Sequence, residues 1–448
     1  MFFHRWSDAR RESPVAEAAR ATHSSPAMLP DLIEIVPPIR PIDATVVLPG
    51  SKSLTNRALI LAALAGNPVT LRGALWSEDT QAMVDCLRRL GFSIEAAADP
   101  AEPANCTLTV HGCGGKIPNA GTPAQPLELF VENAGTAARF LPPLLCLGHG
   151  AWRVSGVPRM HERPQASLIQ ALRALGYHID SANDRLPAVI HGTGPRHGAS
   201  CSVSVEESSQ FASALLLSER IGGWEVRVTG GNVDELPYVE MTRRLVDDFP
   251  WDGGVYDVEP DASSASYFWG AGWLLRDGGS RITVTPAPAS GMQADQKFRD
   301  LILEQAWQPV LSRSTDLADS IMTAIVLAPF APSATRFTDL GRLRVQECER
   351  VEALRTELTK CGAHVEEIGD TLRIDPGPLR GAELETYGDH RIAMCFGMLG
   401  LRVPGIRLRN PACVRKTFPN FFAKLAELGA VIRRASDGTQ LSGDDLLA

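Results

Sequence analysis

The sequence predicts an α/β protein of two domains, in which sheets surround buried helices, and three observations support this fold class. The chain has 448 residues, which is more than one hydrophobic core usually accommodates. A segment of helical periodicity that stops at glycine and runs into a short strand recurs along the chain. The helices of these repeats are strongly apolar, as is typical of helices packed inside a protein.

Four close copies of this unit share a helix, a glycine and a strand, at residues 83–95, 168–180, 354–366 and 421–433. We expect their glycines to end the helices in the left-handed conformation that costs glycine least: Gly91, Gly176, Gly362 and Gly429. Two looser copies lie at residues 241–258 and 298–312. Six units indicate two groups of three, with the linker near residues 259–261.

The composition excludes several classes of protein. A net charge of −8 argues against a general nucleic-acid or membrane-surface binder. No run of eighteen apolar residues that would cross a membrane is present in the sequence. The nine cysteines form no CxxC pair, so we expect reduced thiols in a cytoplasmic protein and no metal site.

Residues 1–32 are predicted to form a disordered N-terminal extension. Arginines and acidic residues alternate there with little apolar periodicity, and no apolar core of a secretory signal is present. Acidic residues such as Asp8 and Glu12 argue against an organellar transit peptide. Met28 is an alternative start of the chain.

The stretch "VVLPGSKSLTNRALILAALAG", residues 46–66, predicts a strand followed by an apolar helix that begins among polar side chains. Ser51 or Ser53 is expected to cap this helix and Gly66 to close it. Lys52 and Arg57 add charge where the helix dipole already favours an anion. The spacing differs from a nucleotide-binding P-loop, so the segment predicts either a phosphate or carboxylate site or a capped helix with two solvated cations.

The same arrangement recurs at other predicted helix starts. Gly135 opens the helix of "ENAGTAARFL", Ser208 and Ser209 that of "EESSQFASALLL", and Asp389 that of "YGDHRIAMCFG". Further isolated cations follow in other motifs: Arg159, Arg350 and Lys416. Together these patterns favour a cleft that is lined by helix N-termini and binds a small polyanion.

From about residue 33 to 433 the chain resembles the 5-enolpyruvylshikimate-3-phosphate synthase family. The motifs that carry the resemblance occur in the family's order: "LPGSKSLTNRAL", "NAGTAAR", "PRMHERP", "SSQ", "PYVEMT", "DASSASYF", "DSIMT", "RVQECER", "GDHRIAM" and "KTFPNF". The resemblance implies a two-domain inverse α/β barrel in which each domain has three βαβαββ units around parallel helices. Residues 51–259 would form one domain, and residues 33–50 with 260–448 the other, with the active site in the cleft between them.

The reaction implied by the resemblance moves the enolpyruvyl group of phosphoenolpyruvate to the 5-hydroxyl of shikimate 3-phosphate and releases phosphate, without cofactor or metal. The motifs assign phosphoenolpyruvate binding to Lys52, Gly135, Arg159, Gln210, Arg350, Arg391 and Lys416. They assign acceptor binding to Lys52, Ser53, Arg57, Ser208, Ser209, Gln210, Tyr238, Asp319, Arg342 and Gln346.

The catalytic residues implied by the resemblance are Asp319, Glu347, Lys52 and His390. Asp319 would deprotonate the attacking hydroxyl, and Glu347 would carry the proton to and from the methylene carbon. Because a carboxylate among cations is normally ionised, proton donation by Glu347 requires burial to raise its pKa. His390 is either an assisting group or a structural hydrogen-bond donor.

Some positions depart from the family pattern, and most of them fall in the acceptor half of the site. Gln346 stands where a lysine is usual, Arg342 where a neutral amide is common, and Glu235 where a serine touches the acceptor phosphate. The acceptor is therefore either shikimate 3-phosphate or another cyclic alcohol. A non-catalytic binding protein that retains the cleft is a further alternative.

The sister family, UDP-N-acetylglucosamine enolpyruvyl transferase, is disfavoured by Ser53 and by the lack of a cysteine near "GVPRMHERP". Glyphosate sensitivity stays open, since Gly135 leaves room for the inhibitor whereas Phe140 replaces a common proline behind that loop. We expect a monomer with no nucleic-acid or membrane partner.

Overall fold

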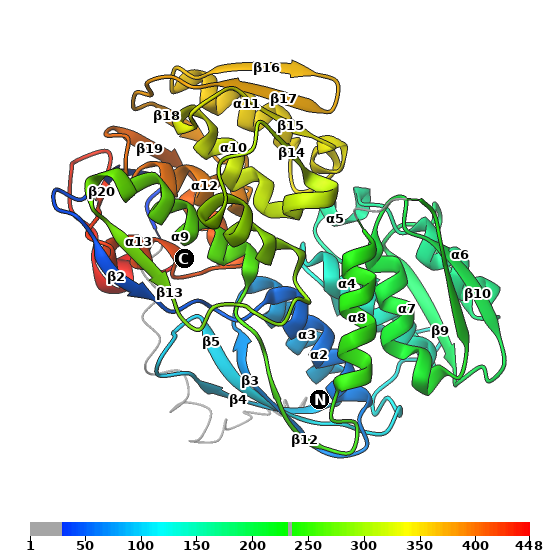
Figure 1. Cartoon of the computed structure of the whole chain (residues 1–448). Helices are drawn as coiled ribbons and strands as arrows, with labels where there is room; N and C mark the ends of the chain where they lie inside the picture. The colour runs from blue at the N-terminus through cyan, green and yellow to red at the C-terminus, as the bar shows by residue number, and fades with distance from the viewer. Residues whose placement is uncertain (1–28, 232–234) are drawn as a thin grey trace, which may run out of the picture.

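The computed structural model describes residues 29–231 and 235–448. Two hydrophobic clusters divide these residues. One is formed by side chains between Leu54 and Val258, and the part of the chain around it, residues 51–259, is called half A here. The other combines side chains of residues 29–48 with those of 265–446, and the surrounding residues, 29–50 and 260–448, are called half B. The two halves lie side by side in Figure 1. The predicted domain boundaries themselves stay a prediction.

The sheets of half A surround its helices. One sheet has the order β12 (Gly254–Asp257), β3 (Val69–Leu75), β5 (Asn105–His111), β4 (Ser93–Ala98), and a second the order β6 (Leu127–Phe130), β7 (His149–Ser155), β9 (Ala188–Thr193), β8 (His178–Asp180). A third has only β10 (Ser200–Ser204) and β11 (Glu225–Thr229). In both four-stranded sheets the first pair is parallel and the other pairs are antiparallel.

Half B repeats this pattern. One of its four-stranded sheets has the order β14 (Val310–Ser312), β15 (Thr335–Thr338), β17 (Thr371–Asp375), β16 (His364–Ile368). The other has the order β18 (Glu383–Glu385), β19 (Ile406–Arg409), β1 (Leu32–Val36), β20 (Val431–Arg434). Its third sheet pairs β13 (Arg281–Val284) with β2 (Asp43–Val46). The six predicted helix-to-strand units are present, but their strands lie in four of the six sheets: β4 and β12 share one sheet, β14 and β16 share another, and β8 and β20 lie in two more. Within the described residues, the third unit of each half keeps only the parallel pair, so it is shorter than the predicted βαβαββ unit.

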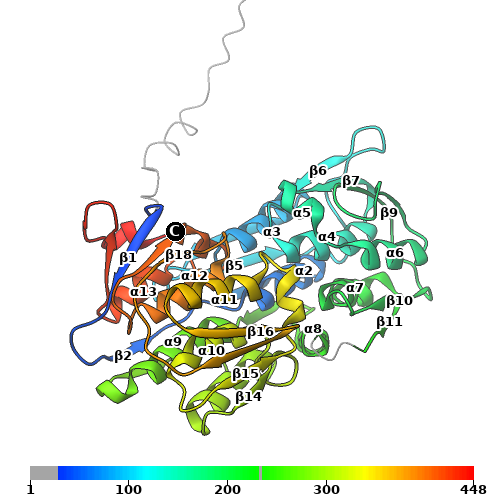
Figure 2. The ribbon, with the colours of Figure 1, turned by 90° about the horizontal axis from the view of Figure 1, so that it is seen from above.

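The helices that the sheets enclose are buried along most of their length, as their apolar composition predicts. In half A they are α2 (Lys52–Leu64), α4 (Gly135–Cys146) and α7 (Ser209–Gly222); in half B they are α9 (Ala262–Leu275), α10 (Ile321–Leu327) and α12 (His390–Leu399). Outer helices include α3 (Glu78–Arg89), α5 (Pro158–Glu162), α6 (Ala166–Ala174), α8 (Leu236–Asp248), α11 (Arg350–Lys360) and α13 (Phe421–Glu427). Figures 1 and 2 show the enclosed helices grouped inside each half. The α/β fold with enclosed helices is confirmed.

The glycines of the repeats behave as predicted. Gly91, Gly176, Gly362 and Gly429 follow their helices with φ of 90°, 91°, 94° and 90°. This left-handed conformation reverses the chain from the helix into the next strand at little cost for glycine. The two looser copies of the repeat are also present in the structure: α8 leads to β12, and a π-helical turn at Arg299–Glu304 leads to β14.

The chain passes between the halves twice, and the two passages lie together. Ser51 N donates to Glu259 O at 2.8 Å, and Asp261 N donates to Pro49 O at 2.9 Å. A Cβ on Gly50 would lie 2.0 Å from Gly73 O, so only glycine fits this crossing. The two connections between the halves therefore lie side by side.

The N-terminal extension predicted for residues 1–32 falls on residues 1–28 outside the described part of the chain. Residues 29–32 belong to the fold instead: Leu29 is buried against the half B core, and Leu32 opens β1. Hydrophobic burial of Leu29 explains this difference. Among the described residues, the structure has no helix long and apolar enough to cross a membrane.

Candidate active site

One pocket lies at the ends where the enclosed helices begin, and residues of both halves line it. The structure brings to it these predicted residues: Lys52, Ser53, Arg57, Gly135, Ser208, Ser209, Gln210, Tyr238, Asp319, Arg342, Gln346, Glu347, Arg350, His390 and Arg391. Lys416 lies directly behind, with Nζ 3.1 Å from Glu347 Oε1. Arg159 does not line the pocket; it is half exposed and paired with Glu162 at 2.6 Å. The roles of these residues stay predictions.

The start of α2 differs in detail from the sequence-based prediction. Ser51 is the N-cap residue, but its side chain makes no capping hydrogen bond, and its buried hydroxyl has no partner within the described structure. The helix also ends at Leu64, before Gly66. Lys52 instead pairs with the buried carboxylate of Asp79 at 3.0 Å. This helix start thus leaves the Ser51 hydroxyl and the first-turn N–H groups available to a ligand.

Two buried arginines of half A are held by neutral oxygens. Arg57 donates to the hydroxyls of Thr242 and Ser213 at 2.8 and 3.1 Å, and its guanidinium lies over the ring of Phe140. Burial lowers the pKa of Arg57 to about 10, which leaves it charged at neutral pH. No carboxylate of the described residues lies within ion-pair distance of it.

Arg139, which the site prediction did not include, repeats this arrangement at the start of α4. Its guanidinium donates to Gly135 O and to Gln210 Oε1, each at 3.1 Å. Burial, and the charges of Arg163 and Arg342, lower its pKa well below the usual value. A Cβ on Gly135 would lie 2.7 Å from Arg139 Nη1 and 2.9 Å from Arg163 Nη2, so these cations pack directly against the glycine.

The cations of half B are paired with carboxylates. Arg350 forms a forked pair with Asp389, with Nε 2.7 Å from Oδ2 and Nη2 3.2 Å from Oδ1. Its Nη2 also lies 2.9 Å from Glu347 Oε2, and Lys416 holds the other oxygen of Glu347. Gln346 Oε1 accepts a further hydrogen bond from Arg350. Asp389 therefore both caps α12, through Arg391 N at 2.8 Å, and orients Arg350.

Asp319 is held between two arginines. Its Oδ1 lies 3.1 Å from Arg313 Nη2, and its Oδ2 lies 3.3 Å from Arg391 Nη2. Burial by itself would raise the pKa of Asp319, but Arg391 and Arg313 outweigh it and hold the pKa below the usual range. The preceding residue, Ala318, has a φ of 43°, a strained conformation for alanine that turns Asp319 into the pocket.

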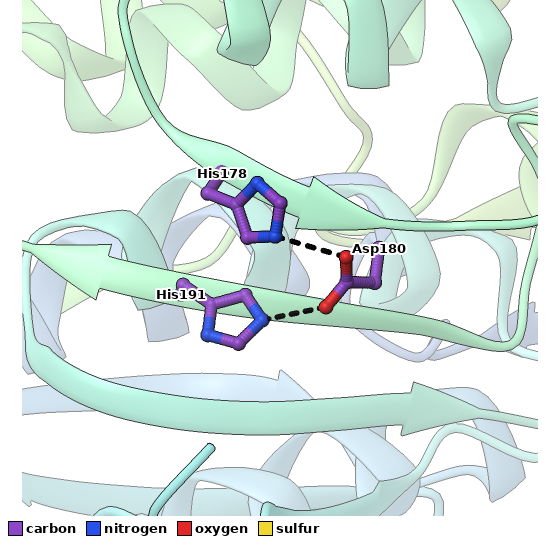
Figure 3. A group of neighbouring side chains, drawn as sticks. All are labelled: His178, Asp180 and His191. Carbon is purple, nitrogen blue, oxygen red and sulfur yellow. Dashed lines mark hydrogen bonds and ion pairs between the residues drawn. The ribbon is translucent and has the colours of Figure 1, made fainter.

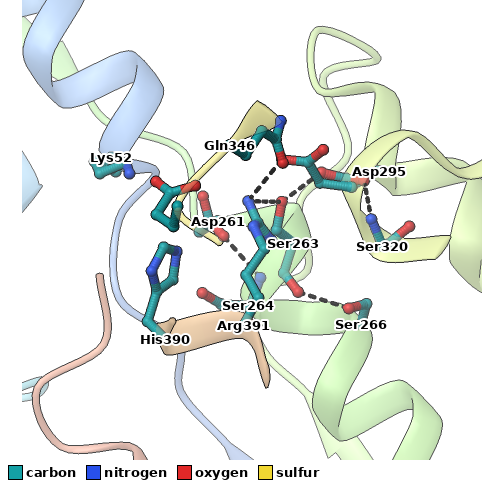
Figure 4. A network of polar contacts seen from close by, with 12 residues as sticks. Lys52, Asp261, Ser263, Ser264, Ser266, Asp295, Ser320, Gln346, His390 and Arg391 are labelled. Atoms are coloured by element: carbon teal, nitrogen blue, oxygen red, sulfur yellow. Dashed lines mark hydrogen bonds and ion pairs between the residues drawn. The ribbon is translucent and has the colours of Figure 1, made fainter. Parts of the chain in front are cut away.

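Asp295 is a second buried carboxyl in the pocket, and sequence reasoning missed it. Figure 4 shows it beside Ser263 and Ser320: Ser263 donates to its Oδ2, and Ser320 N donates to its Oδ1 at 2.7 Å. Burial and the charge of Asp319 raise the pKa of Asp295 to about 6. Asp295 lies in a loop without a motif, so only the adjoining "DASSASYF" helix start offered a signal.

The two pocket carboxyls near Arg391 are therefore tuned in opposite directions. Asp319 is ionised at any pH near neutrality, whereas Asp295 titrates close to it. Paired carboxyls with separated pKa values are a common feature of sites that move protons.

Glu347 does not have the raised pKa that proton donation requires. Burial acts in that direction, but Lys416 and Arg350 outweigh it and hold the pKa of Glu347 well below its usual value. Both cations lie within 3.1 Å of its oxygens. These two contacts keep Glu347 ionised in this structure, so the condition for proton donation is not met here.

His390 is buried, and within the described structure its Nδ1 has no hydrogen-bond partner. Burial lowers the pKa of His390 well below its usual value, and the charges of Lys52, Lys416 and Arg391 act in the same direction. The imidazole is therefore neutral. Figure 4 shows it in the pocket with Lys52 and Arg391, where an unpaired ring nitrogen is available to a bound molecule.

Glu235 occupies the N-terminus of α7 with its own carboxylate. Ser209 N donates to its Oε2 at 2.6 Å, and Arg342 of half B lies 3.4 Å from its Oε1. Glu235 is almost fully buried. The anion site predicted at Ser208 and Ser209 is therefore filled by a side chain of the protein, and Arg342 pairs with that side chain.

The model of the family described as EPSP synthase (3-phosphoshikimate 1-carboxyvinyltransferase) matches residues 36–252 and 313–425. A 3-phosphoshikimate 1-carboxyvinyltransferase of Opitutus terrae is 40% identical over 437 residues, which cover 89% of this chain and 98% of the relative. The enzyme of the same description from Nostoc punctiforme is 34% identical over 435 residues, 89% of this chain and 99% of the relative.

Solved structures show the same fold. An EPSP synthase from Acinetobacter baumannii superposes with a TM-score of 0.71 at 22% identity and covers 90% of this chain and 100% of its own. The enolpyruvyl transferase NikO from Streptomyces tendae gives a TM-score of 0.65 at 18% identity, over 92% and 99% of the two chains. With the family model matched on both sides of the cleft and relatives similar over nearly their full length, the chain belongs to the EPSP synthase family of transferases.

Proposed function

We propose that the protein transfers the enolpyruvyl group of phosphoenolpyruvate to the 5-hydroxyl of shikimate 3-phosphate and releases phosphate. The observation that carries this proposal is one pocket in which helix N-termini and cations of both halves converge. A phosphate ester carries a charge of about −1.5 to −2 near neutral pH, and phosphoenolpyruvate adds a carboxylate. Such ligands need the clustered cations that the pocket supplies.

Phosphoenolpyruvate binds, in this proposal, where Lys52, Arg350, Arg391 and Lys416 meet Gly135. Two of these cations are paired with Glu347 in the structure. As they turn toward the anionic substrate, they stabilise the charge of Glu347 less, and its pKa rises. Substrate binding thereby converts Glu347 from an ionised group into a proton donor.

The reaction then proceeds by addition and elimination. Asp319 takes the proton of the 5-hydroxyl, the oxygen bonds to C2 of phosphoenolpyruvate, and Glu347 gives its proton to the methylene carbon. In the second step the methyl carbon returns a proton to Glu347, the double bond re-forms, and the C2–O bond to phosphate breaks. Arg391 and Arg313 keep Asp319 ionised and oriented until it accepts the proton.

The test is phosphate release from the full chain with phosphoenolpyruvate and shikimate 3-phosphate, both at millimolar concentration. We expect one phosphate per enolpyruvyl ether formed, and a rate that falls by roughly 10²–10⁴ in Glu347→Gln. No phosphate release with this pair of substrates contradicts the proposal. Binding of both substrates without turnover favours a binding protein instead.

A second candidate function is favoured by Glu235. Its carboxylate lies 2.6 Å from Ser209 N, where the family resemblance places the acceptor phosphate, and two anions repel each other at this distance. An acceptor with a neutral hydroxyl group at this position binds without moving Glu235. The second candidate is therefore enolpyruvyl transfer to an unphosphorylated cyclic alcohol.

Comparison of shikimate 3-phosphate with shikimate as acceptor separates the two candidates. If the phosphorylated compound is the acceptor, the wild-type protein uses it and Glu235→Ser lowers its KM, because a competing anion is removed. If the acceptor is unphosphorylated, the wild-type protein prefers shikimate and Glu235→Ser shifts the preference toward the phosphate ester. Glu206→Ser, outside the pocket on the segment before α7, is the control.

Four finer expectations belong to this proposal. We propose a monomeric, cytoplasmic enzyme that acts on small molecules rather than on nucleic acid or membranes, and light scattering of the purified chain tests the first point. Glyphosate inhibition is proposed because Gly135 keeps Arg139 and Arg163 close to the pocket. A competition experiment against phosphoenolpyruvate tests it.

A further inference from the structure

Three side chains that can bind a metal ion gather on one sheet of half A, outside the active-site pocket. His178 and Asp180 are alternate residues of β8, so their side chains leave the same face of the strand. His191 of β9 is the direct register partner of His178. Figure 3 shows both imidazoles facing the carboxylate of Asp180. Within the described residues this is the one group of three histidine, cysteine or acidic side chains that is compact enough to share an ion.

The geometry of the three ligand atoms is close to that of a metal site. His178 Nε2 lies 2.9 Å from Asp180 Oδ1, and His191 Nε2 lies 2.8 Å from Asp180 Oδ2. The ligand atoms all lie within 4.8 Å of one another. Tetrahedral Zn²⁺ with bonds near 2.1 Å places its ligand atoms about 3.4 Å apart, so rotations of the two rings and the carboxylate bring all three atoms to one ion.

The strands fix the ligands while solvent keeps access to them. The β8–β9 ladder continues from His178↔His191 to Asp180↔Val189, which fixes the spacing of the backbone that carries the three side chains. The side chains of His178 and Asp180 are 71% and 58% exposed, and that of His191 is 18% exposed. An ion can therefore enter from solvent and keep a water as its remaining ligand.

We infer that His178, Asp180 and His191 form a surface binding site for a late first-row divalent cation, with Zn²⁺ as the favoured ion. Imidazole nitrogen suits zinc, copper and nickel, whereas magnesium and calcium prefer all-oxygen sites. On binding, the proton of each Nε2 moves to Nδ1 and the nitrogen takes the metal, so neutral histidine remains.

A bound ion here joins β8 to β9. β8 has three residues and is the edge strand of its sheet, so few ladder hydrogen bonds hold it. The ion adds a link between these neighbouring strands without touching the pocket. The site therefore acts on the stability of this hairpin and is independent of the proposed function.

The chain contains a matched control in half B. His364 and Asp375 are directly opposed on the corresponding hairpin of β16 and β17, with Nδ1 2.8 Å from Oδ2. This pair offers two ligands where the proposed site offers three. Removing it changes one exposed histidine–aspartate contact without affecting the inferred ion.

The experiment is calorimetric titration of the full chain with ZnCl₂ under reducing conditions, for the wild type, His178→Asn, His191→Asn, Asp180→Asn and His364→Asn. We expect one site that each of the first three substitutions weakens by roughly ten-fold or more, while His364→Asn leaves it unchanged. A zinc-dependent rise in melting temperature is expected in the wild type and in His364→Asn only. MgCl₂ is expected to give no such rise.

Equal zinc affinity in the wild type and in the three ligand variants overturns the inference, because the ion then binds elsewhere, such as at a cysteine. Absence of zinc binding by the wild type overturns it as well. The nine cysteines are common to all variants, so differences between them report on the three ligands alone.

Discussion

The two walls of the pocket carry similar numbers of cations but treat them differently. In half A, Arg57 and Arg139 are buried against hydroxyls, an amide and carbonyl oxygens. In half B, Arg350, Arg391 and Lys416 each contact a carboxylate. Apart from Lys52, which pairs with Asp79, half A therefore leaves its buried pocket cations without a counter-charge, whereas carboxylates neutralise the cations of half B.

This difference between the walls explains how one cleft can both bind anions and move protons. A buried cation with neutral partners gains most when an anionic ligand arrives, because that ligand supplies its missing counter-charge. A cation that shares a carboxylate can instead exchange that partner for a ligand and change the carboxylate's pKa. We interpret half A as the wall that binds anions and half B as the wall that binds anions and moves protons.

The largest expected effect is on turnover, from Asp319→Asn. The substitution removes the general base but keeps the shape of the side chain, so we expect kcat to fall by roughly 10²–10⁴. Binding of phosphoenolpyruvate is retained or tightened, since Arg391 and Arg313 lose a competing anion. Steady-state kinetics and a binding titration check both parts.

Asp316→Asn is the control for that variant, because Asp316 lies three residues earlier, in the preceding turn Arg313–Leu317, and outside the pocket. It should leave kcat within about two-fold of the wild type, as expected for a group that does not touch substrate. Unchanged turnover in Asp319→Asn would mean that proton removal does not belong to half B.

A large loss of stability is expected from Asp389→Ala. Arg350 is buried and would lose its forked partner, and breaking such a pair costs about 3–5 kcal/mol. Asp261→Ala is the matched variant: Asp261 caps α9 through Ser264 N at 2.7 Å but pairs with no cation of the described residues. Its loss should cost about 1 kcal/mol. If urea unfolding shows equal losses of unfolding free energy in Asp389→Ala and Asp261→Ala, the assignment of Arg350 to the neutralised wall is contradicted.

Arg57→Met tests the opposite wall. We expect acceptor affinity to fall by roughly 10- to 100-fold, which corresponds to the loss of a charge-assisted hydrogen bond. Stability should change by no more than about 1 kcal/mol, because a buried cation without a counter-charge is replaced by an apolar chain. Thr242 and Ser213 still hydrogen-bond to each other at 2.9 Å. A stability loss as large as that of Asp389→Ala would remove the contrast between the walls.

The smallest expected effect concerns pH and Asp295. Its pKa of about 6 in the folded chain exceeds the ordinary value of 3.8. The folded state therefore binds more protons than the unfolded state between these two values, and this group's contribution to stability falls as pH rises from about 4 to 6. Above pH 6 the contribution is constant.

Asp319 and Glu347 act in the opposite sense, since their lowered pKa values stabilise the fold near neutrality and lose that effect as pH falls below about 4. Asp295→Asn should thus remove the part of the decline in melting temperature between pH 4 and 6 that Asp295 causes. The melting temperature at lower pH should follow the same profile as in the wild type. An unchanged profile would show that Asp295 does not titrate in this window.

Much of the architecture follows from local sequence. The apolar helices, the glycines that end them and the spacing of the repeats specify six similar units, because helical periodicity and left-handed glycine act within a few residues. The motifs likewise predicted most of their residues into the pocket; the exceptions are Arg159, which lies beside it, and Lys416, which lies directly behind it. These features depend on short-range physics, which a sequence records directly.

Only the tertiary structure decided which charges are compensated. Asp295 and Asp79 reach the pocket from segments without a motif, and the pKa of Glu347 depends on Lys416, 69 positions away. The partner of Glu235 comes from the other half of the molecule, and the histidines of the proposed zinc site meet because two strands pair in one register. Electrostatic interaction depends on distance in space and on burial, and neither can be read from the order of residues in the chain.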